Sequence, residues 1–111
     1  MQFKECYQNP FIEERADPYI TLGPDGFYYF TASYPMKSAD DKDGYDRVIL
    51  RRAKDISELA SAEEITIWKV ADTTLTHRFI WAPELHYIAG LWYVFYAGSE
   101  DKENNWAFDC H

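Results

Sequence analysis

Residues 26–33 read Gly-Phe-Tyr-Tyr-Phe-Thr-Ala-Ser, and this stretch decides the fold. Aromatic and β-branched residues dominate it, and such residues favour β-strands. A Gly-Pro-Asp-Gly segment at 23–26, which is a strong turn signal, comes just before it and follows a short extended segment at 19–22. The sequence therefore predicts a β-hairpin with strands at 19–22 and 27–33.

Two more strands are expected in the first half of the chain. Residues 47–53 and 64–69 both have the apolar and β-branched pattern of strands. Between them, Asp55 resembles a helix N-cap, so residues 55–62 are expected to hold a turn or two of helix. The acidic, polar residues 37–44 are expected to form an exposed loop.

The hairpin pattern then recurs. Residues 84–97 form a second hairpin pattern with its turn at Ala89-Gly90, and positions 26–30 correspond to positions 90–94. An internal repeat of roughly 60 residues, with four short antiparallel strands in each unit, is typical of β-propeller blades. A small β-sandwich with similar hairpins fits the pattern equally well. Both hairpins also follow an alanine combined with a proline and an acidic residue: Ala16-Asp17-Pro18 and Ala82-Pro83-Glu84.

Composition and charge limit the classes of function that fit this chain. The 111 residues allow one domain at most, and a hydrophobic share of 47% argues against disorder. A net charge of −8 repels phosphate backbones, so nucleic acid is an unlikely partner, and no apolar run approaches the length that spans a membrane. Tyrosine and tryptophan build sheet faces and also the platforms on which sugar rings stack. Neutral sugars fit this balance, although an acidic surface also serves solubility alone.

The cysteines and the start of the chain indicate in which cellular compartment the protein is expected. Cys6 and Cys110 lie near opposite ends, without the spacing of a metal site. Residues 1–5 contain no apolar signal core, so the sequence predicts free thiols and a cytoplasmic protein. A truncated or processed start would leave secretion open.

An ordered set of motifs resembles glycoside hydrolase family 43. The set comprises Asn9-Pro10-Phe11, Arg15-Ala16-Asp17-Pro18-Tyr19-Ile20, Phe27-Tyr28-Tyr29-Phe30-Thr31 and Ile80-Trp81-Ala82-Pro83-Glu84. Residues 45–53 are similar to the α-L-arabinofuranosidase-type members. The resemblance implies an all-β fold of antiparallel sheets, with residues 1–111 as the N-terminal part of a five-bladed β-propeller. Blade one would cover about 16–70 and the start of blade two about 80–111.

The resemblance also implies an activity. Members of the family hydrolyse O-glycosyl bonds with inversion, and this chain would help remove α-L-arabinofuranosyl or β-xylosyl units from the ends of plant polysaccharides or oligosaccharides. Its partners would be arabinose- or xylose-containing oligosaccharides. The alternatives are a non-catalytic carbohydrate-binding or structural propeller fragment, and a complete small β-domain without a sugar role.

Four residues match or adjoin the family's site. Asp17 matches the general base, and its place before a proline predicts extended backbone geometry. Trp81 matches the tryptophan that lines the sugar pocket. Phe30 and Tyr34 are weaker candidates for the same wall, and core packing is the better interpretation of Phe30.

Other parts of the machinery are expected elsewhere. The family's general acid and its tuning aspartate come in later motifs that do not occur after Ser99, so we do not assign Glu84 as the acid, and we expect the fragment alone to be inactive. No cofactor is required, although a structural divalent cation in the full-length propeller is allowed. His77, His86 and His111 lack zinc-site spacing, and no metal ligand is assigned.

Overall fold

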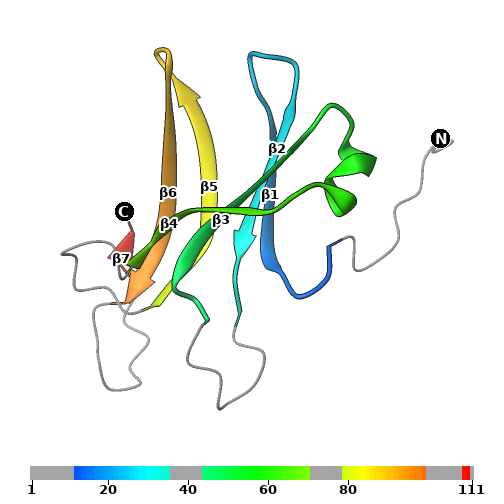
Figure 1. The fold of residues 1–111 in the computed structure, drawn as a ribbon. Coiled ribbons are helices and arrows are strands. Elements are labelled where there is room, and N and C mark those ends of the chain that lie inside the picture. Colours follow the sequence, from blue (N-terminus) through cyan, green and yellow to red (C-terminus); the bar gives the residue numbers. More distant parts are fainter. Residues whose placement is uncertain (1–11, 36–43, 71–78, 100–108, 111) are drawn as a thin grey trace, which may run out of the picture.

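The structure is a computed structural model that describes residues 12–35, 44–70, 79–99 and 109–110. In these residues the chain forms two antiparallel sheets. The first sheet has four strands in the order β1-β2-β3-β4, and the second has three in the order β5-β6-β7 (Figure 1). The strands are β1 (Ala16–Leu22), β2 (Tyr28–Ser33), β3 (Arg47–Ala53), β4 (Ile65–Lys69), β5 (Phe79–Ile88), β6 (Leu91–Ser99) and β7 (Asp109–Cys110).

The spatial order of the strands follows their order in the chain, which makes each sheet a simple meander. A four-stranded antiparallel meander is the unit of a propeller blade, whereas an immunoglobulin-like sandwich places its strands by Greek-key crossovers. The all-β, blade-like fold expected from the sequence is confirmed. The blade bounds of about 16–70 and 80–111 stay a prediction, and the loop expected at 37–44 lies almost wholly outside the described residues.

Three strands differ from expectation. β1 begins at Ala16 rather than at residue 19, β5 begins at Phe79 rather than at residue 84, and β7 was not foreseen. Pro83 lies inside β5, and a proline inside a sequence run argues against a strand because it cannot donate to the ladder. The chain accommodates Pro83 at a bulge, which the periodicity alone does not reveal.

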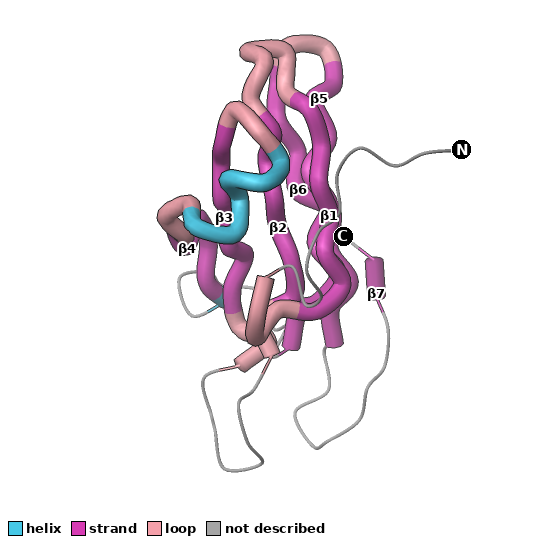
Figure 2. The backbone as a smooth tube through the Cα atoms, turned by 90° about the vertical axis from the view of Figure 1, so that its right-hand side faces the viewer, coloured by secondary structure: helices cyan, strands magenta, loops and turns pink. Residues whose placement is uncertain are grey.

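The expected helix is a short 3₁₀ segment, η1 (Ile56–Ser61). Asp55 stands at its N-cap position, as predicted, but makes no side-chain capping hydrogen bond. The segment is held from the sheet instead, because Arg51 on β3 donates to the carbonyls of Leu59 (3.0 Å) and Ala60 (2.9 Å). Figure 2 shows η1 lying across the outer face of the first sheet.

The main core lies between η1 and this outer face. Its buried members come from β2, β3, η1 and the segment before β1: Ile12, Phe30, Ala32, Ile49, Ala53 and Leu59. Alternation along the strands places Phe30 and Ala32 on this side, and Thr31 and Ser33 on the other side, facing the second sheet. Both faces of the first sheet are therefore covered at β2, whereas Leu22 on β1 and Ile65 on β4 stay exposed at the two edges.

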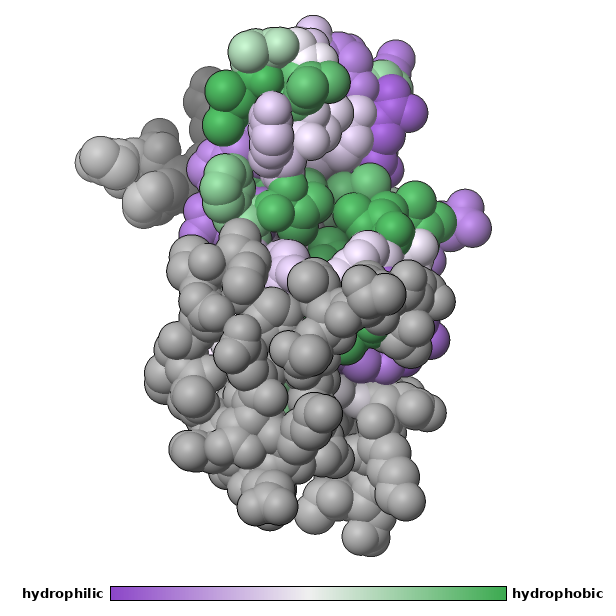
Figure 3. Space-filling view, turned by 90° about the vertical axis from the view of Figure 1, so that its left-hand side faces the viewer, coloured by the Kyte–Doolittle hydropathy of each residue, from purple (hydrophilic) through white to green (hydrophobic). Residues whose placement is uncertain are grey.

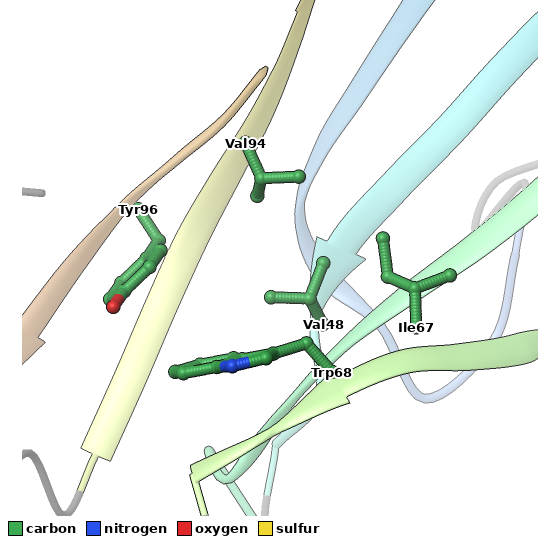
Figure 4. A pocket seen from close by; sticks show the side chains of 5 residues that line it. All are labelled: Val48, Ile67, Trp68, Val94 and Tyr96. Carbon is green, nitrogen blue, oxygen red and sulfur yellow. The ribbon is translucent and has the colours of Figure 1, made fainter. Parts of the chain in front are cut away.

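The second sheet stands beside the first, with β5 packed against β1 and β2. The turns of the β1–β2 and β5–β6 hairpins lie at the same end of the molecule (Figure 1). At the other end, the Ile80 amide donates to the Tyr45 carbonyl at 2.7 Å and joins the two sheets. A pocket of about 370 Å³ lies between β6 and the pair β3 and β4. Its lining is almost entirely apolar (Figure 4) and consists of Val48, Ile67, Trp68, Val94 and Tyr96.

The far face of the second sheet presents exposed apolar side chains. The register pairs Glu84 with Phe95, His86 with Tyr93, and Ile88 with Leu91, which puts these side chains on one face. Phe95, Tyr93, Ile88 and Leu91 are all exposed there, and apolar side chains gather on this side of the molecule in Figure 3.

Candidate active site

The first strand of each hairpin, β1 or β5, carries a β-bulge. Between Ala16 and Tyr19 the β1–β2 register gains one residue, and the β5–β6 register gains one between Trp81 and Glu84. At each bulge the residue before the proline has a positive φ, of 49° at Asp17 and 50° at Ala82.

The extended geometry predicted for Asp17 is therefore wrong. A residue before proline normally adopts φ of about −120°, but the bulge forces Asp17 into the left-handed region. Aspartate tolerates this region better than most residues, because its short polar side chain can hydrogen-bond locally.

The strand registers show which residues of the two hairpins are equivalent. Pro18 in the first hairpin corresponds to Pro83 in the second, so Asp17 corresponds to Ala82 and not to the acidic Glu84. The matching of positions 26–30 with 90–94 agrees with the registers and with the positive φ of Gly26 (83°) and Gly90 (86°). The second bulge thus has the backbone of the first without its carboxylate.

Asp17 has a single described anchor. The side chain of Asp17 is exposed, and the Ser33 hydroxyl donates to its Oδ2 at 2.8 Å. The same hydroxyl accepts a hydrogen bond from the backbone N–H of Ala82 at 2.7 Å. Ser33 is only 1% exposed, so a buried hydroxyl joins the bulge of β1 to the bulge of β5.

Trp81 and Glu84 flank the second bulge. Trp81 is half-buried and pairs with Ala97, on the same sheet face as Glu84. Glu84 is 53% exposed and its Oε1 lies 3.0 Å from His86 Nε2, so these two residues share one face of β5. The His86 ring lies 5.6 Å from that of Tyr19 on β1. Asp17 and Glu84 accordingly lie on neighbouring strands.

The two weaker wall candidates have structural contacts. Phe30 is 1% exposed and belongs to the main core, so its ring cannot touch a sugar, and core packing is the correct interpretation. The Tyr34 ring has the guanidinium carbons of Arg15 and Arg47 over it, each 4.1 Å from its centroid. These cation–π contacts favour a structural role. Sugar binding by Tyr34 and Trp81 stays a prediction.

Sequence reasoning missed the ion cluster beneath the first bulge. Arg15 Nε and Nη2 meet the two carboxylate oxygens of Glu64 at 3.0 and 2.5 Å, and Arg51 Nε lies 3.3 Å from Oε1. Burial raises the pKa of Glu64, but hydrogen bonds and charge from Arg15 and Arg51 outweigh it and hold the pKa below its ordinary value. The cluster ties Arg15, which precedes the bulge, to Arg51 on β3 and to Glu64, the residue just before β4. No local motif reports it, because its members lie 49 and 13 positions apart.

The described residues offer no metal centre and no membrane-spanning helix. Within the described ranges, no three histidine, cysteine, aspartate or glutamate side chains gather closely enough to hold an ion. His77, His111 and Cys6 lie outside the described residues. No helix in the same ranges is long and apolar enough to cross a membrane. The expectations about cofactors and the divalent cation stay predictions.

Comparison with known proteins places this geometry in a family. The family described as glycosyl hydrolases family 43 matches residues 7–111. The extracellular exo-alpha-(1->5)-L-arabinofuranosidase of Streptomyces avermitilis is 43% identical over 97 residues, which is 87% of this chain and 18% of that protein. Alpha-L-arabinofuranosidase 43 of Humicola insolens is 46% identical over 91 residues, 82% of this chain and 17% of that protein.

A solved structure agrees with the sequence relatives. The crystal structure of an alpha-L-arabinofuranosidase from Lactobacillus brevis superposes with a TM-score of 0.71 at 41% identity, and the match covers 94% of this chain and 31% of that one. The present chain thus spans less than a third of the length of these relatives.

Proposed function

Because the chain belongs to glycosyl hydrolases family 43, we propose that it forms the first part of a hydrolase that removes α-L-arabinofuranosyl units from the ends of arabinose-containing glycans. The names of the relatives favour arabinofuranose over xylose. They also favour an enzyme over a non-catalytic binding propeller.

The observation that carries the proposal is the Asp17 carboxylate. It is exposed, it stands on the bulge of β1, and Ser33 fixes one of its oxygens. An inverting glycosidase needs an ionised carboxylate to accept a proton from the water that attacks the anomeric carbon, while a separate acid protonates the leaving oxygen. We assign the base to Asp17 and expect the acid outside residues 1–111, so the fragment alone is expected to be inactive.

Trp81 is proposed as part of the sugar-binding wall. An indole offers an apolar face that a furanose ring can cover. Trp81 is only half-buried, and it adjoins the bulge whose amide contacts Ser33.

The proposed base is tested by Asp17→Asn in the longest natural reading frame that contains this chain. Turnover of an aryl α-L-arabinofuranoside should fall by a factor of about 100 or more, while arabinose-containing oligosaccharides should still bind in calorimetry. NMR of the first product should show the inverted anomer. A loss of only a few-fold would contradict the assignment of Asp17.

The proposed cellular location of the parent protein rests on the names of two relatives. The Streptomyces avermitilis and Streptomyces chartreusis relatives are both named extracellular, and nothing supports the cytoplasmic location expected from residues 1–5. We propose that the parent protein acts outside the cell on polymeric substrate. Recovery of the activity in the culture supernatant, rather than in the cell lysate, would support this location.

A further inference from the structure

We infer that Ser33 is a positioning residue, which sets the direction of the Asp17 carboxylate by joining it to the backbone of the second hairpin. The inference rests on the proposed role of Asp17 as the base. It adds a residue that no family motif quoted above contains, because Ser33 lies at the end of β2, 16 positions from Asp17.

The hydrogen-bonding capacity of a hydroxyl fixes the polarity of this link. A serine hydroxyl has one proton to donate and two lone pairs that accept. The Ala82 N–H can only donate, so it uses a lone pair of Ser33 Oγ at 2.7 Å. An ionised carboxylate can only accept, so the Ser33 proton is directed to Asp17 Oδ2 at 2.8 Å. The one Ser33 proton is thus used by Asp17, and a Ser33 lone pair by the backbone of Ala82.

The position of the hydroxyl is fixed on both sides. Ser33 is 1% exposed and lies within the β1–β2 ladder, paired with Ala16. Its second partner, Ala82, is held at the β5 bulge beside Pro83. The hydroxyl is therefore a rigid reference point for Asp17, which is itself exposed and would otherwise rotate about its side-chain bonds.

The link also leaves one carboxylate oxygen for chemistry. Within the part of the chain that the structure describes, Asp17 Oδ2 accepts from Ser33 and Oδ1 has no hydrogen-bond partner. Oδ1 is then the oxygen that takes the proton from water. Misplacement of a reacting group by about 1 Å can lower the rate on the order of 100-fold, so loss of the anchor should act on the chemical step.

The test compares Ser33→Ala with Ser33→Thr in the longest natural reading frame that contains this chain. With an aryl α-L-arabinofuranoside, Ser33→Ala should lower kcat by about 10- to 100-fold with little change in KM. Ser33→Thr keeps the hydroxyl and should recover most of the loss. If Ser33→Ala does not fold, Ser33→Cys takes its place, because a thiol of similar size is a weaker donor.

Thr31→Val is the matched control. Thr31 is also a fully buried hydroxyl on β2, and it donates to the Ile49 carbonyl at 2.7 Å without contacting Asp17. Its removal should lower the melting temperature, as Ser33→Ala does, but should leave kcat unchanged. Rates are compared well below both melting temperatures.

A double-mutant cycle separates positioning from a general structural role. Asp17→Gly removes the carboxylate and suits the positive φ at this site. In that background, Ser33→Ala should change the residual kcat by less than about 2-fold. An equal loss in both backgrounds, or no loss in the wild-type background, would overturn the role of Ser33 while leaving Asp17 as the base. Full activity of Asp17→Gly would overturn both assignments together.

Discussion

The bulges of β1 and β5 are the same backbone device with two different uses. Each adds one residue before a proline, and each holds that residue at a φ near 50°. The first bulge places a carboxylate, Asp17, whereas the second places the methyl group of Ala82 and offers its N–H to Ser33. The two bulges share the same backbone geometry and differ in the side chain that each one presents.

On the proposed assignment of Asp17 as the base, the second hairpin also helps to hold that base. The N–H of Ala82 holds Ser33, and Ser33 holds Asp17. The second hairpin therefore contributes to the first hairpin's carboxylate through its backbone alone.

Exchanging Asp17 and Ala82 should have the largest effect on turnover. The double variant Asp17→Ala/Ala82→Asp keeps the composition and moves the carboxylate to the other bulge, where Ser33 does not anchor it. Turnover of an aryl arabinofuranoside should fall by a factor of about 100 or more, as expected for loss of a general base. Activity within tenfold of the wild type would show that the two bulges are interchangeable. The melting temperature of Asp17→Ala alone provides the reference for folding.

Disrupting the ion cluster of Arg15, Arg51 and Glu64, which adjoins the first bulge, should have the next largest effect, and this effect is on stability. Glu64 is 18% exposed and binds Arg15 and Arg51, so Glu64→Gln should lower the free energy of unfolding by about 1–3 kcal/mol at neutral pH. The folded-state pKa of Glu64 is lowered, so this contribution is present above the unfolded pKa and is lost as the pH falls through the folded one.

Denaturant unfolding of both proteins between neutral pH and acid should thus show a gap that closes at low pH. Glu58→Gln is the control, because Glu58 is exposed and has no side-chain partner among the described residues. A gap that stays constant as the pH falls would contradict the paired, ionised state of Glu64.

The sequence predicted the local elements better than the contacts between them. The strand at Arg47–Ala53 was predicted with its observed bounds, and the hairpin turns at Gly26 and Gly90 have the positive φ that glycine accommodates. The bulges were missed, because a proline and one extra residue break the two-residue period on which strand prediction depends. Ser33 was missed for another reason: its role depends on Asp17 and Ala82 together, 16 and 49 positions away.

Trp81 sharpens the comparison, since its register equivalent in the first hairpin is Ala16. Trp81→Ala should weaken the binding of arabinose-containing oligosaccharides about tenfold, which corresponds to about 1.4 kcal/mol. Isothermal calorimetry on the Asp17→Asn background measures this without turnover.

Trp68→Ala is the control for Trp81→Ala, because Trp68 lines the pocket between the sheets and lies 5.3 Å from the Tyr96 ring. It should lower the melting temperature without changing the affinity. If Trp81→Ala unfolds the protein without a separable binding defect, Trp81 is a core residue.

The smallest expected difference is between the two hairpin turns, which should respond equally to the same substitution. Gly26 and Gly90 have nearly equal positive φ, and a Cβ added at either would meet no atom within 4 Å. Alanine at each position should therefore cost only the strain of the left-handed backbone, about 1–2 kcal/mol. Gly26→Ala and Gly90→Ala should give the same shift in thermal unfolding, and a clear difference would mean that the turns are not equivalent.

The most direct test of the central claim, that Asp17 alone of the two bulge residues does chemistry, is azide rescue of Asp17→Gly. Azide is already an anion, so it attacks the anomeric carbon and expels the aryloxide without a base to accept a proton. The variant should be nearly inactive in buffer, and azide should restore turnover with the inverted arabinofuranosyl azide as product, detected by NMR and mass spectrometry. Substantial hydrolysis without azide, or no azide product and no rescue in a folded variant that still binds sugar, would contradict the assignment of Asp17 as the general base.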